Sequence, residues 1–321
     1  MTSTRKHAKN HFMSNGITST PVVRFAPSPN GRLHLGHARS ALLNQGFANR
    51  TGGTMLLRIE DIDRERSRPE FEAEILSDLA WLGLKWPEPV RRQSDRFPAY
   101  REALATLQER GLVYPAFMSR GEIRRAVERK EADGAAWPRD PDGAPHYPGN
   151  ERHLDENERA ALIGTGKSFA WRLDMASALE VVGLDADHPL TWLEAGESDG
   201  PGKRVIANPL KWGDVILARR DTPVSYHLAV VLDDCDQGIT DVIRGQDLYE
   251  ATAVHRLLQT LLGLPAPTYR HHCLVTDQHG RKLAKSDQDI TLSALREAGH
   301  TTNDIRTMAG ISAPLQAFVA G

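Results

Sequence analysis

The sequence contains little cysteine, no long apolar run and no large excess of charge of either sign. Cys235 and Cys273 are its only cysteines in 321 residues, too few for a disulfide framework or a four-thiolate metal site, which favours a reducing compartment. No stretch approaches the roughly 20 apolar residues of a membrane span, and residues 1–20 lack the apolar core of a signal peptide. The formal net charge of -2 excludes a uniformly basic nucleic-acid-binding protein, so one local face would have to bind any RNA partner. We expect a cytoplasmic globular protein.

Strand-like and helix-like segments alternate in the first part of the chain. Strand patterns at 22–25 and 54–59 alternate with helical patterns at 35–50, 67–82 and 97–110. This alternation predicts an α/β fold, a Rossmann-like parallel sheet with helices on both faces. In such folds ligands bind beyond the carboxyl ends of the strands.

The middle of the chain breaks this alternation. Residues 113–214 are rich in Pro, Gly and Asp, which predicts an inserted α+β subdomain. Strands are expected again at 215–218, 226–232 and 239–243, followed by a helix at 251–262.

The expected domains follow from these segments. Residues 1–20 lack periodicity and are expected to be a disordered leader, with Met13 as an alternative start. The catalytic domain is expected in two halves, 21–112 and 215–275, separated by the insertion 113–214. Residues 276–321 are expected to hold a basic loop and a short helical tail.

The turn-rich segment Pro27–His37 lies between a predicted strand and a predicted helix, where phosphates bind. The first amides of a helix favour an anion, and Gly36 has no side chain that would block a base or a ribose. His34 and His37 lie one turn apart and can both donate hydrogen bonds to phosphate oxygens. An H-x-x-H pair is also common on protein surfaces and in metal sites, so this motif alone leaves its role open.

A second motif is the basic run Gly280–Ser286. Most such runs are solvated surface. Lys282, Lys285 and Ser286 on a loop that starts at glycine could also close on a triphosphate and neutralise the charge on leaving pyrophosphate.

Together the two motifs resemble the signatures of class I aminoacyl-tRNA synthetases. HLGH at 34–37 and KLAKS at 282–286 are similar to the sequences usually written HIGH and KMSKS. Four further segments resemble the glutamyl branch in the family's order: 24–31, 57–63, 226–234 and 242–248. The resemblance covers most of residues 22–311 and implies activation of glutamate with ATP and Mg²⁺. It implies catalytic roles for His34, His37 and Lys285, and ATP contacts from Pro27, Gly36, Lys282 and Ser286.

The residue types in these segments also suit glutamate, which presents two carboxylates and one ammonium group. An arginine fork can hold each carboxylate, a carboxylate and a hydroxyl can accept from the ammonium group, and a phenol can add a further hydrogen bond. The sequence does not assign the two carboxylates to particular arginines. The resemblance places the following residues in the amino-acid pocket: Arg24, Ala26, Ser28, Glu60, Tyr226 and Arg244.

Many members of this family hold zinc in the inserted, acceptor-type subdomain through a Cys-x-Cys pair, a tyrosine and a further cysteine. The matching positions here are Ala116, Met118, Tyr147 and Glu151. Alanine offers no ligand atom, and a thioether is a poor ligand for zinc. We therefore expect no structural zinc at this place and no other metal site.

Two other patterns predict no site. His271 and His272 lie beside Cys273, but adjacent side chains in a strand point to opposite faces, so a structural role is expected. Residues 164–168 resemble the end of a phosphate-binding loop, yet Ala161 stands where the first glycine is required.

The chain stops soon after its second signature, which resembles the glutamyl-queuosine tRNA(Asp) synthetases. By resemblance, these activate glutamate without tRNA and attach it to queuosine in the anticodon of tRNA(Asp). The implied partners are L-glutamate, ATP and queuosine-containing tRNA(Asp). We expect a monomer that has no anticodon-binding domain and does not associate with a membrane. Two alternatives stay open: a truncated glutamyl-tRNA synthetase that acylates a tRNA 3′ end, and a noncatalytic paralogue that binds glutamate, nucleotide or RNA.

RNA would need cations on the catalytic face, because the net charge is not basic. Any single arginine is more often a solvated surface residue. The candidates, taken as a set, are Arg91, Arg92, Arg96, Arg101, Arg124, Arg125, Arg219 and Arg220.

Overall fold

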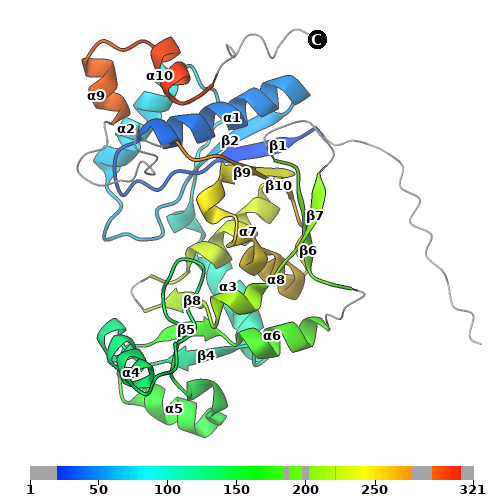
Figure 1. Cartoon of the computed structure of the whole chain (residues 1–321). Helices are drawn as coiled ribbons and strands as arrows, with labels where there is room; N and C mark the ends of the chain where they lie inside the picture. The colour runs from blue at the N-terminus through cyan, green and yellow to red at the C-terminus, as the bar shows by residue number, and fades with distance from the viewer. Residues whose placement is uncertain (1–19, 184–187, 197–201, 221, 276–290, 312–321) are drawn as a thin grey trace, which may run out of the picture.

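The computed structural model describes residues 20–183, 188–196, 202–220, 222–275 and 291–311 (Figure 1). Its first elements are β1 (Val22–Phe25), α1 (Leu35–Thr51), β2 (Thr54–Ile59), α2 (Pro69–Trp81), β3 (Arg91–Arg92), η1 (Gln93–Arg96) and α3 (Phe97–Glu109). The predicted alternation of strands and helices in this part is confirmed.

The remaining elements run from the middle of the chain to its tail. They are β4 (Val113–Ala116), α4 (Arg120–Ala132), η2 (Glu151–His153), α5 (Glu156–Gly164), β5 (Ala170–Leu173), α6 (Met175–Val182), β6 (Thr191–Glu194), β7 (Lys203–Ile206), η3 (Pro209–Trp212), β8 (Ile216–Arg219), α7 (Tyr226–Asp236), β9 (Asp241–Gly245), η4 (Gln246–Leu248), α8 (Thr252–Leu262), β10 (Thr268–His272), α9 (Leu292–Glu297) and α10 (Thr302–Met308). Among the residues described, no helix is both long and apolar enough to span a membrane.

Two groups of mostly parallel strands form the layer that carries the candidate site. Strands β1, β2 and β3 are parallel, as are β9, β10 and β6, and β7 adds an antiparallel edge. The groups meet where the N–H of Thr240, just before β9, donates to the carbonyl of Val22 at 2.9 Å. This contact sets β1 beside β9 and gives the order β3-β2-β1-β9-β10-β6-β7. The predicted Rossmann-like fold is confirmed.

Helix α1 covers this layer because its caps and its apolar positions agree. His34 caps its N-terminus, and Gly52 ends it at φ 65°, a left-handed conformation that glycine adopts readily. Ala38 and Leu42 are buried with Val23 of β1 in one hydrophobic cluster. The helix therefore fixes its N-terminus beside the end of β1.

One predicted strand is wrong. The apolar run 226–232 is the start of α7, which begins after Ser225, whose hydroxyl accepts from the N–H of Leu228 at 3.4 Å. Leu228 and the three residues that follow it are buried. A helix that is buried over most of its circumference lacks a polar face. Its sequence then shows no 3.6-residue period and looks like the continuous apolar run of a buried strand.

A second sheet lies at the end of the molecule away from α9 and α10 (Figure 1). It has the antiparallel order β4-β5-β8 and lies beside α4 and α5. Pairing crosses the expected domain boundaries, because β8 joins the inserted sheet while β6 and β7 join β10. Strand partners are determined by contacts between residues far apart in the chain, which a local sequence pattern does not contain. The domain boundaries expected from the sequence therefore stay predictions.

Candidate active site

A cavity of about 430 Å³ opens at the carboxyl ends of β1, β9 and β10. This is where the strand order reverses, the usual ligand position in open α/β sheets. Its volume falls within the range of small-molecule sites. Lys282, Lys285 and Ser286 lie outside the described residues. All the other predicted site residues line the cavity: Arg24, Ala26, Pro27, Ser28, His34, Gly36, His37, Glu60, Tyr226 and Arg244.

The two signature histidines are oriented by the backbone of the first turn of α1. Nδ1 of His34 accepts from the N–H of Gly36 at 3.1 Å, and Nδ1 of His37 accepts from the N–H of His34 at 3.2 Å. Because Nδ1 accepts in both rings, a neutral ring carries its proton on Nε2. A Cβ on Gly36 would lie 3.0 Å from Cε1 of His34, so glycine leaves room for that ring.

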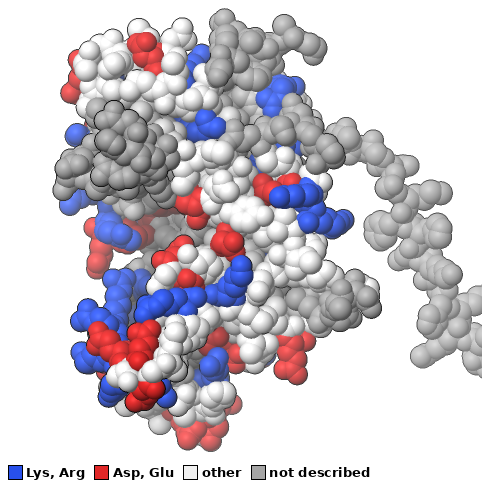
Figure 2. Space-filling model, in the orientation of Figure 1, with Lys and Arg blue, Asp and Glu red and all other residues white. Residues whose placement is uncertain are grey.

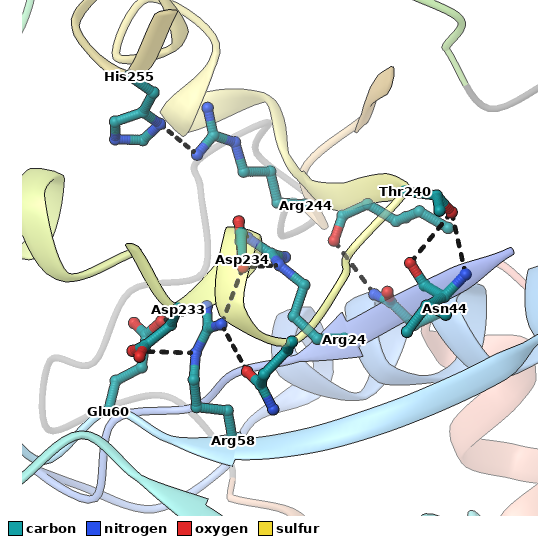
Figure 3. Close-up of polar contacts among 12 residues, drawn as sticks. Arg24, Asn44, Arg58, Glu60, Asp233, Asp234, Thr240, Arg244 and His255 are labelled. Atoms are coloured by element: carbon teal, nitrogen blue, oxygen red, sulfur yellow. Dashed lines mark hydrogen bonds and ion pairs between the residues drawn. The ribbon is translucent and has the colours of Figure 1, made fainter. Parts of the chain in front are cut away.

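Two arginines share one buried carboxylate at the floor of the cavity (Figure 3). Asp234 accepts from Nε and Nη2 of Arg24 at 3.0 and 3.3 Å, and from Nη1 of Arg58 at 2.8 Å. Burial alone would raise the pKa of Asp234, but Arg24 and Arg58 outweigh it, so its pKa is lowered. Arg24 therefore meets the cavity with a protein carboxylate, shared with Arg58, already beside its charge.

Glu60 lies at the same floor and accepts from Nη2 of Arg58 at 3.2 Å. Burial raises the pKa of Glu60, although Arg58 and Arg24 oppose the rise. A substrate ammonium group beside Glu60 would favour its charged form.

The second predicted carboxylate-binding residue, Arg244, is held differently. It lies one residue before the end of β9 and is 5% exposed. Nη2 donates to the hydroxyl of Thr252 at 2.7 Å and to the carbonyl of Leu248 at 3.0 Å, while Nη1 donates to the hydroxyl of Tyr226 at 3.4 Å. Its other N–H contacts go to two buried imidazoles. No carboxylate among the described residues pairs with it.

Comparison with known proteins agrees with this geometry. The family model described as tRNA synthetases class I (E and Q), catalytic domain, matches residues 21–311. The chain belongs to this family. A Rhodobacter capsulatus protein named glutamyl-Q tRNA(Asp) synthetase is 46% identical over 292 residues, which cover 90% of this chain and 100% of that relative. A Symbiobacterium thermophilum protein of the same name is 39% identical and covers 86% of this chain and 81% of its own.

The similarity extends to solved structures of the family. A glutamate tRNA ligase from Elizabethkingia meningosepticum, solved in complex with its amino acid, superposes with a TM-score of 0.73 at 26% identity. That match covers 94% of this chain and 64% of the ligase. The family resemblance drawn from the motifs is confirmed.

Sequence reasoning missed several residues of the site. Arg58 and Asp234 stand inside segments that resemble the glutamyl branch, but no role was expected for them. The available signal was one charged residue in each of two largely apolar segments, Arg58 in the first and Asp234 in the second. Their pairing becomes visible only in the structure, where the two segments lie side by side. His255 and Glu194 gave no signal, because each is a single residue outside any motif.

The place where many members of this synthetase family hold zinc has a different donor set here. The hydroxyl of Tyr147 donates to Oε1 of Glu151 at 2.7 Å and accepts from the N–H of Met118 at 3.2 Å. Oε1 of Glu151 also accepts from the N–H of Phe117 at 3.2 Å. Tyr147 and Oε1 of Glu151 are thus bound to each other and to backbone N–H groups, while Oε2 of Glu151 is buried without a hydrogen-bond partner among the described residues. One carboxylate and one phenol beside Ala116 and Met118 do not supply the ligands of a tetrahedral zinc site. Within the described ranges, no group of three or more His, Cys, Asp or Glu side chains could hold a metal ion.

Five of the eight candidate RNA-binding arginines fall into two groups. Arg91 and Arg96 both pair with Asp236, at 2.6 and 3.3 Å, and Arg92 pairs with Glu72. Acidic side chains thus compensate the charges of this first group.

The second group lies on the inserted sheet and α4. Arg124 and Arg219 line a cavity of about 1120 Å³ there, together with Arg120. Arg124 approaches Glu128 at 3.9 Å, whereas Arg219 is exposed and pairs with no carboxylate of the described residues. Figure 2 shows Lys and Arg side chains, with acidic ones among them, gathered over this end of the molecule.

Proposed function

We propose that this protein activates L-glutamate with ATP, without tRNA, and transfers the glutamyl group to queuosine in the anticodon of tRNA(Asp). One observation carries the first step. A cavity of about 430 Å³ at the strand-order reversal joins the histidine-bearing N-terminus of α1 to two guanidinium groups and a buried carboxylate. The first feature suits ATP, and the others suit an amino acid with two carboxylates.

In the first step, the α-carboxylate oxygen of glutamate attacks the α-phosphorus of ATP, and the bond to pyrophosphate breaks. ATP enters with Mg²⁺, which helps to neutralise its phosphates. In our proposal, Nε2–H of His34 and His37 donates to phosphate oxygens, and Lys285 neutralises the charge that develops on pyrophosphate. Little covalent chemistry falls to the protein, so orientation of the two substrates dominates.

The amino acid is oriented by charge. Arg24 and Arg244 bind its carboxylates, and Glu60 with the hydroxyl of Ser28 accepts from its ammonium group. Tyr226 adds a phenolic hydrogen bond. These roles rest on the position of each side chain on the cavity wall.

In the second step, a hydroxyl of queuosine attacks the glutamyl carbonyl and AMP leaves. The names of the relatives from R. capsulatus and S. thermophilum support this acceptor. The exposed cations around Arg219, with the cavity that Arg120 and Arg124 line, give the anticodon stem-loop a place to bind. We propose a monomer for both steps.

The decisive experiment separates the two steps and the two acceptor ends. Glutamate-dependent exchange between ATP and pyrophosphate is measured without RNA. Transfer of labelled glutamate is then measured to an anticodon stem-loop of tRNA(Asp) with and without queuosine, which has no CCA end, and to intact tRNA(Glu).

We expect exchange without RNA and transfer only to the stem-loop with queuosine. Transfer to tRNA(Glu) and none to the stem-loop would identify a synthetase that acylates 3′ ends. Binding of glutamate or nucleotide without exchange would identify a noncatalytic paralogue.

A further inference from the structure

We propose that His255 and His271 are positioning residues that hold Arg244 through neutral nitrogen atoms, so that no carboxylate of the described residues compensates its charge before the substrate binds. The proposal rests on glutamate activation as the function of the cavity. It assigns selection of glutamate over glutamine to residues that line the back of Arg244 and do not themselves touch the substrate.

The guanidinium group of Arg244 has five N–H donors and no acceptor. Nε lies 3.1 Å from Nε2 of His271, and Nη1 lies 3.1 Å from Nδ1 of His255. Figure 3 shows the His255 ring facing the guanidinium group of Arg244. With the oxygen acceptors described above, every N–H of Arg244 has a partner, and each of those partners is uncharged when the imidazoles are neutral.

The hydrogen bonds from Arg244 determine which nitrogen of each imidazole carries the proton. Because Arg244 only donates, Nδ1 of His255 and Nε2 of His271 must accept, and each neutral ring carries its proton on the other nitrogen. Nε2 of His255 lies 3.1 Å from Nδ1 of His227, so it donates there. Nδ1 of His271 lies 2.7 Å from Oε2 of Glu194 and donates to that carboxylate. Two ordered chains thus run from Arg244, one to His227 and one to Glu194.

The surroundings of both rings favour their neutral form. Burial lowers the pKa of His255 well below its usual value, and the charges of Arg244 and of the neighbouring histidines act in the same direction. Burial also lowers the pKa of His271, and Arg244 contributes, although Glu194 opposes it. A protonated ring would point an N–H at the guanidinium group and lose its acceptor.

The two arginines of the cavity differ in their carboxylate contacts. Arg24 is bound by both oxygens of Asp234, a carboxylate that it shares with Arg58, so its charge is already partly compensated. Arg244 is equally buried, yet no carboxylate of the described residues pairs with it. A buried charge without a counterion favours an anionic ligand, because a neutral amide can accept the hydrogen bonds but cannot compensate the charge.

The longest contact of Arg244 shows where such a ligand would bind. Nη1 lies 3.4 Å from the hydroxyl of Tyr226, and both residues line the cavity. This N–H is the one most easily redirected to a substrate carboxylate. The imidazoles meanwhile hold the rest of the group in place, and specificity then follows from withholding a protein carboxylate from this arginine.

The test uses pairs of variants that differ in charge but hardly in shape. His255→Asp puts a carboxylate beside Nη1 of Arg244, and His255→Asn keeps a neutral acceptor near the position of Nδ1. Thr252→Asp and Thr252→Asn form a second pair beside Nη2, at the start of α8, where an aspartate is tolerated by the helix dipole. His153→Asn, in the inserted subdomain, is the control.

The readouts are the KM for glutamate, the KM for ATP and the inhibition constant for glutamine, all in pyrophosphate exchange. In each aspartate variant, the preference for glutamate over glutamine, measured as the ratio of the inhibition constant for glutamine to the KM for glutamate, is expected to fall at least about tenfold, about 1.4 kcal/mol. The loss is expected in the KM for glutamate with the KM for ATP unchanged. Each asparagine variant is expected to stay within about threefold of the parent, about 0.7 kcal/mol.

The outcomes separate this proposal from the proposed function. If the parent protein shows no glutamate-dependent exchange, the function itself is wrong. If the parent exchanges but aspartate and asparagine variants lose the same preference, the neutral environment of Arg244 does not select glutamate. The Thr252 pair decides alone if His255→Asp does not fold. In a pH titration followed by nitrogen NMR, His255 and His271 should gain their protons at lower pH than an exposed histidine does; protonation at the same pH as an exposed histidine, or above it, would overturn the proposal.

Discussion

Replacing Asp234 with asparagine tests whether one buried carboxylate holds two arginines of the cavity in place. Asp234 accepts three hydrogen bonds, at 3.0 and 3.3 Å from Arg24 and at 2.8 Å from Arg58. The side chains of these arginines are 5% and 0% exposed. Asparagine keeps an acceptor oxygen but removes the charge. Breaking a buried ion pair from one side costs about 3–5 kcal/mol, and since Glu60 and Asp233 still face Arg58, we expect a loss near 3 kcal/mol.

The assay is urea unfolding beside glutamate-dependent pyrophosphate exchange. Asp236→Asn is a matched control on the same helix, because Asp236 is 44% exposed and its ion pairs with Arg91 and Arg96 are near the surface. Exposed pairs contribute about 0–1 kcal/mol. The Asp234 variant should also raise the KM for glutamate and leave that for ATP unchanged. An unfolding free energy no lower than that of the Asp236 variant would refute the reasoning.

Acid should reduce the difference between the parent and the Asp234 variant. The pKa of Asp234 is lowered in the folded protein, because Arg24 and Arg58 outweigh the opposing effect of burial. Its contribution is therefore complete above the unfolded-state pKa of about 3.9 and is lost as pH falls through the lower folded-state pKa. A difference that grows as the pH falls below the unfolded-state pKa would contradict this assignment.

The remaining predictions concern pH, metal, RNA and chemistry. His255 has a lowered pKa when folded, so the unfolding free energy should fall by up to about 1.4 kcal/mol per pH unit below about pH 6.5, and His255→Asn should remove that part of the slope. Elemental analysis should find no stoichiometric zinc; stoichiometric zinc lost together with activity on chelation would contradict the prediction. Arg219→Ala should weaken transfer to RNA and its dependence on salt between about 50 and 200 mM while exchange persists, and Arg96→Ala should change neither; equal effects would place the RNA elsewhere. Lys285→Ala and His37→Ala should each lower exchange at least about tenfold, about 1.4 kcal/mol of barrier, and unchanged exchange in both would remove them from the mechanism.

The sequence alone determined the features that depend on neighbours in the chain. The apolar spacing of α1 could be read locally, because helical periodicity involves residues a few positions apart. The same holds for β1 and β2, whose short apolar runs end in turn residues. The linked motifs from Arg24 to Arg244 also named most of the cavity wall, because each carries its own residue types in a fixed order.

Only the tertiary structure decided which groups compensate which charges. Arg24 and Asp234 are 210 positions apart, and His271 and Glu194 are 77 apart, so no local pattern pairs them. Residues 226–232 of helix α7 were expected as a strand because burial on most sides hides the helical period. Arg24 and Arg244 look alike in the sequence. They differ in the fold because a carboxylate lies beside Arg24, whereas neutral imidazoles lie beside Arg244. In the buried interior, where charges are weakly screened, the nearest hydrogen-bond acceptor has the largest effect on the electrostatic potential at each guanidinium group.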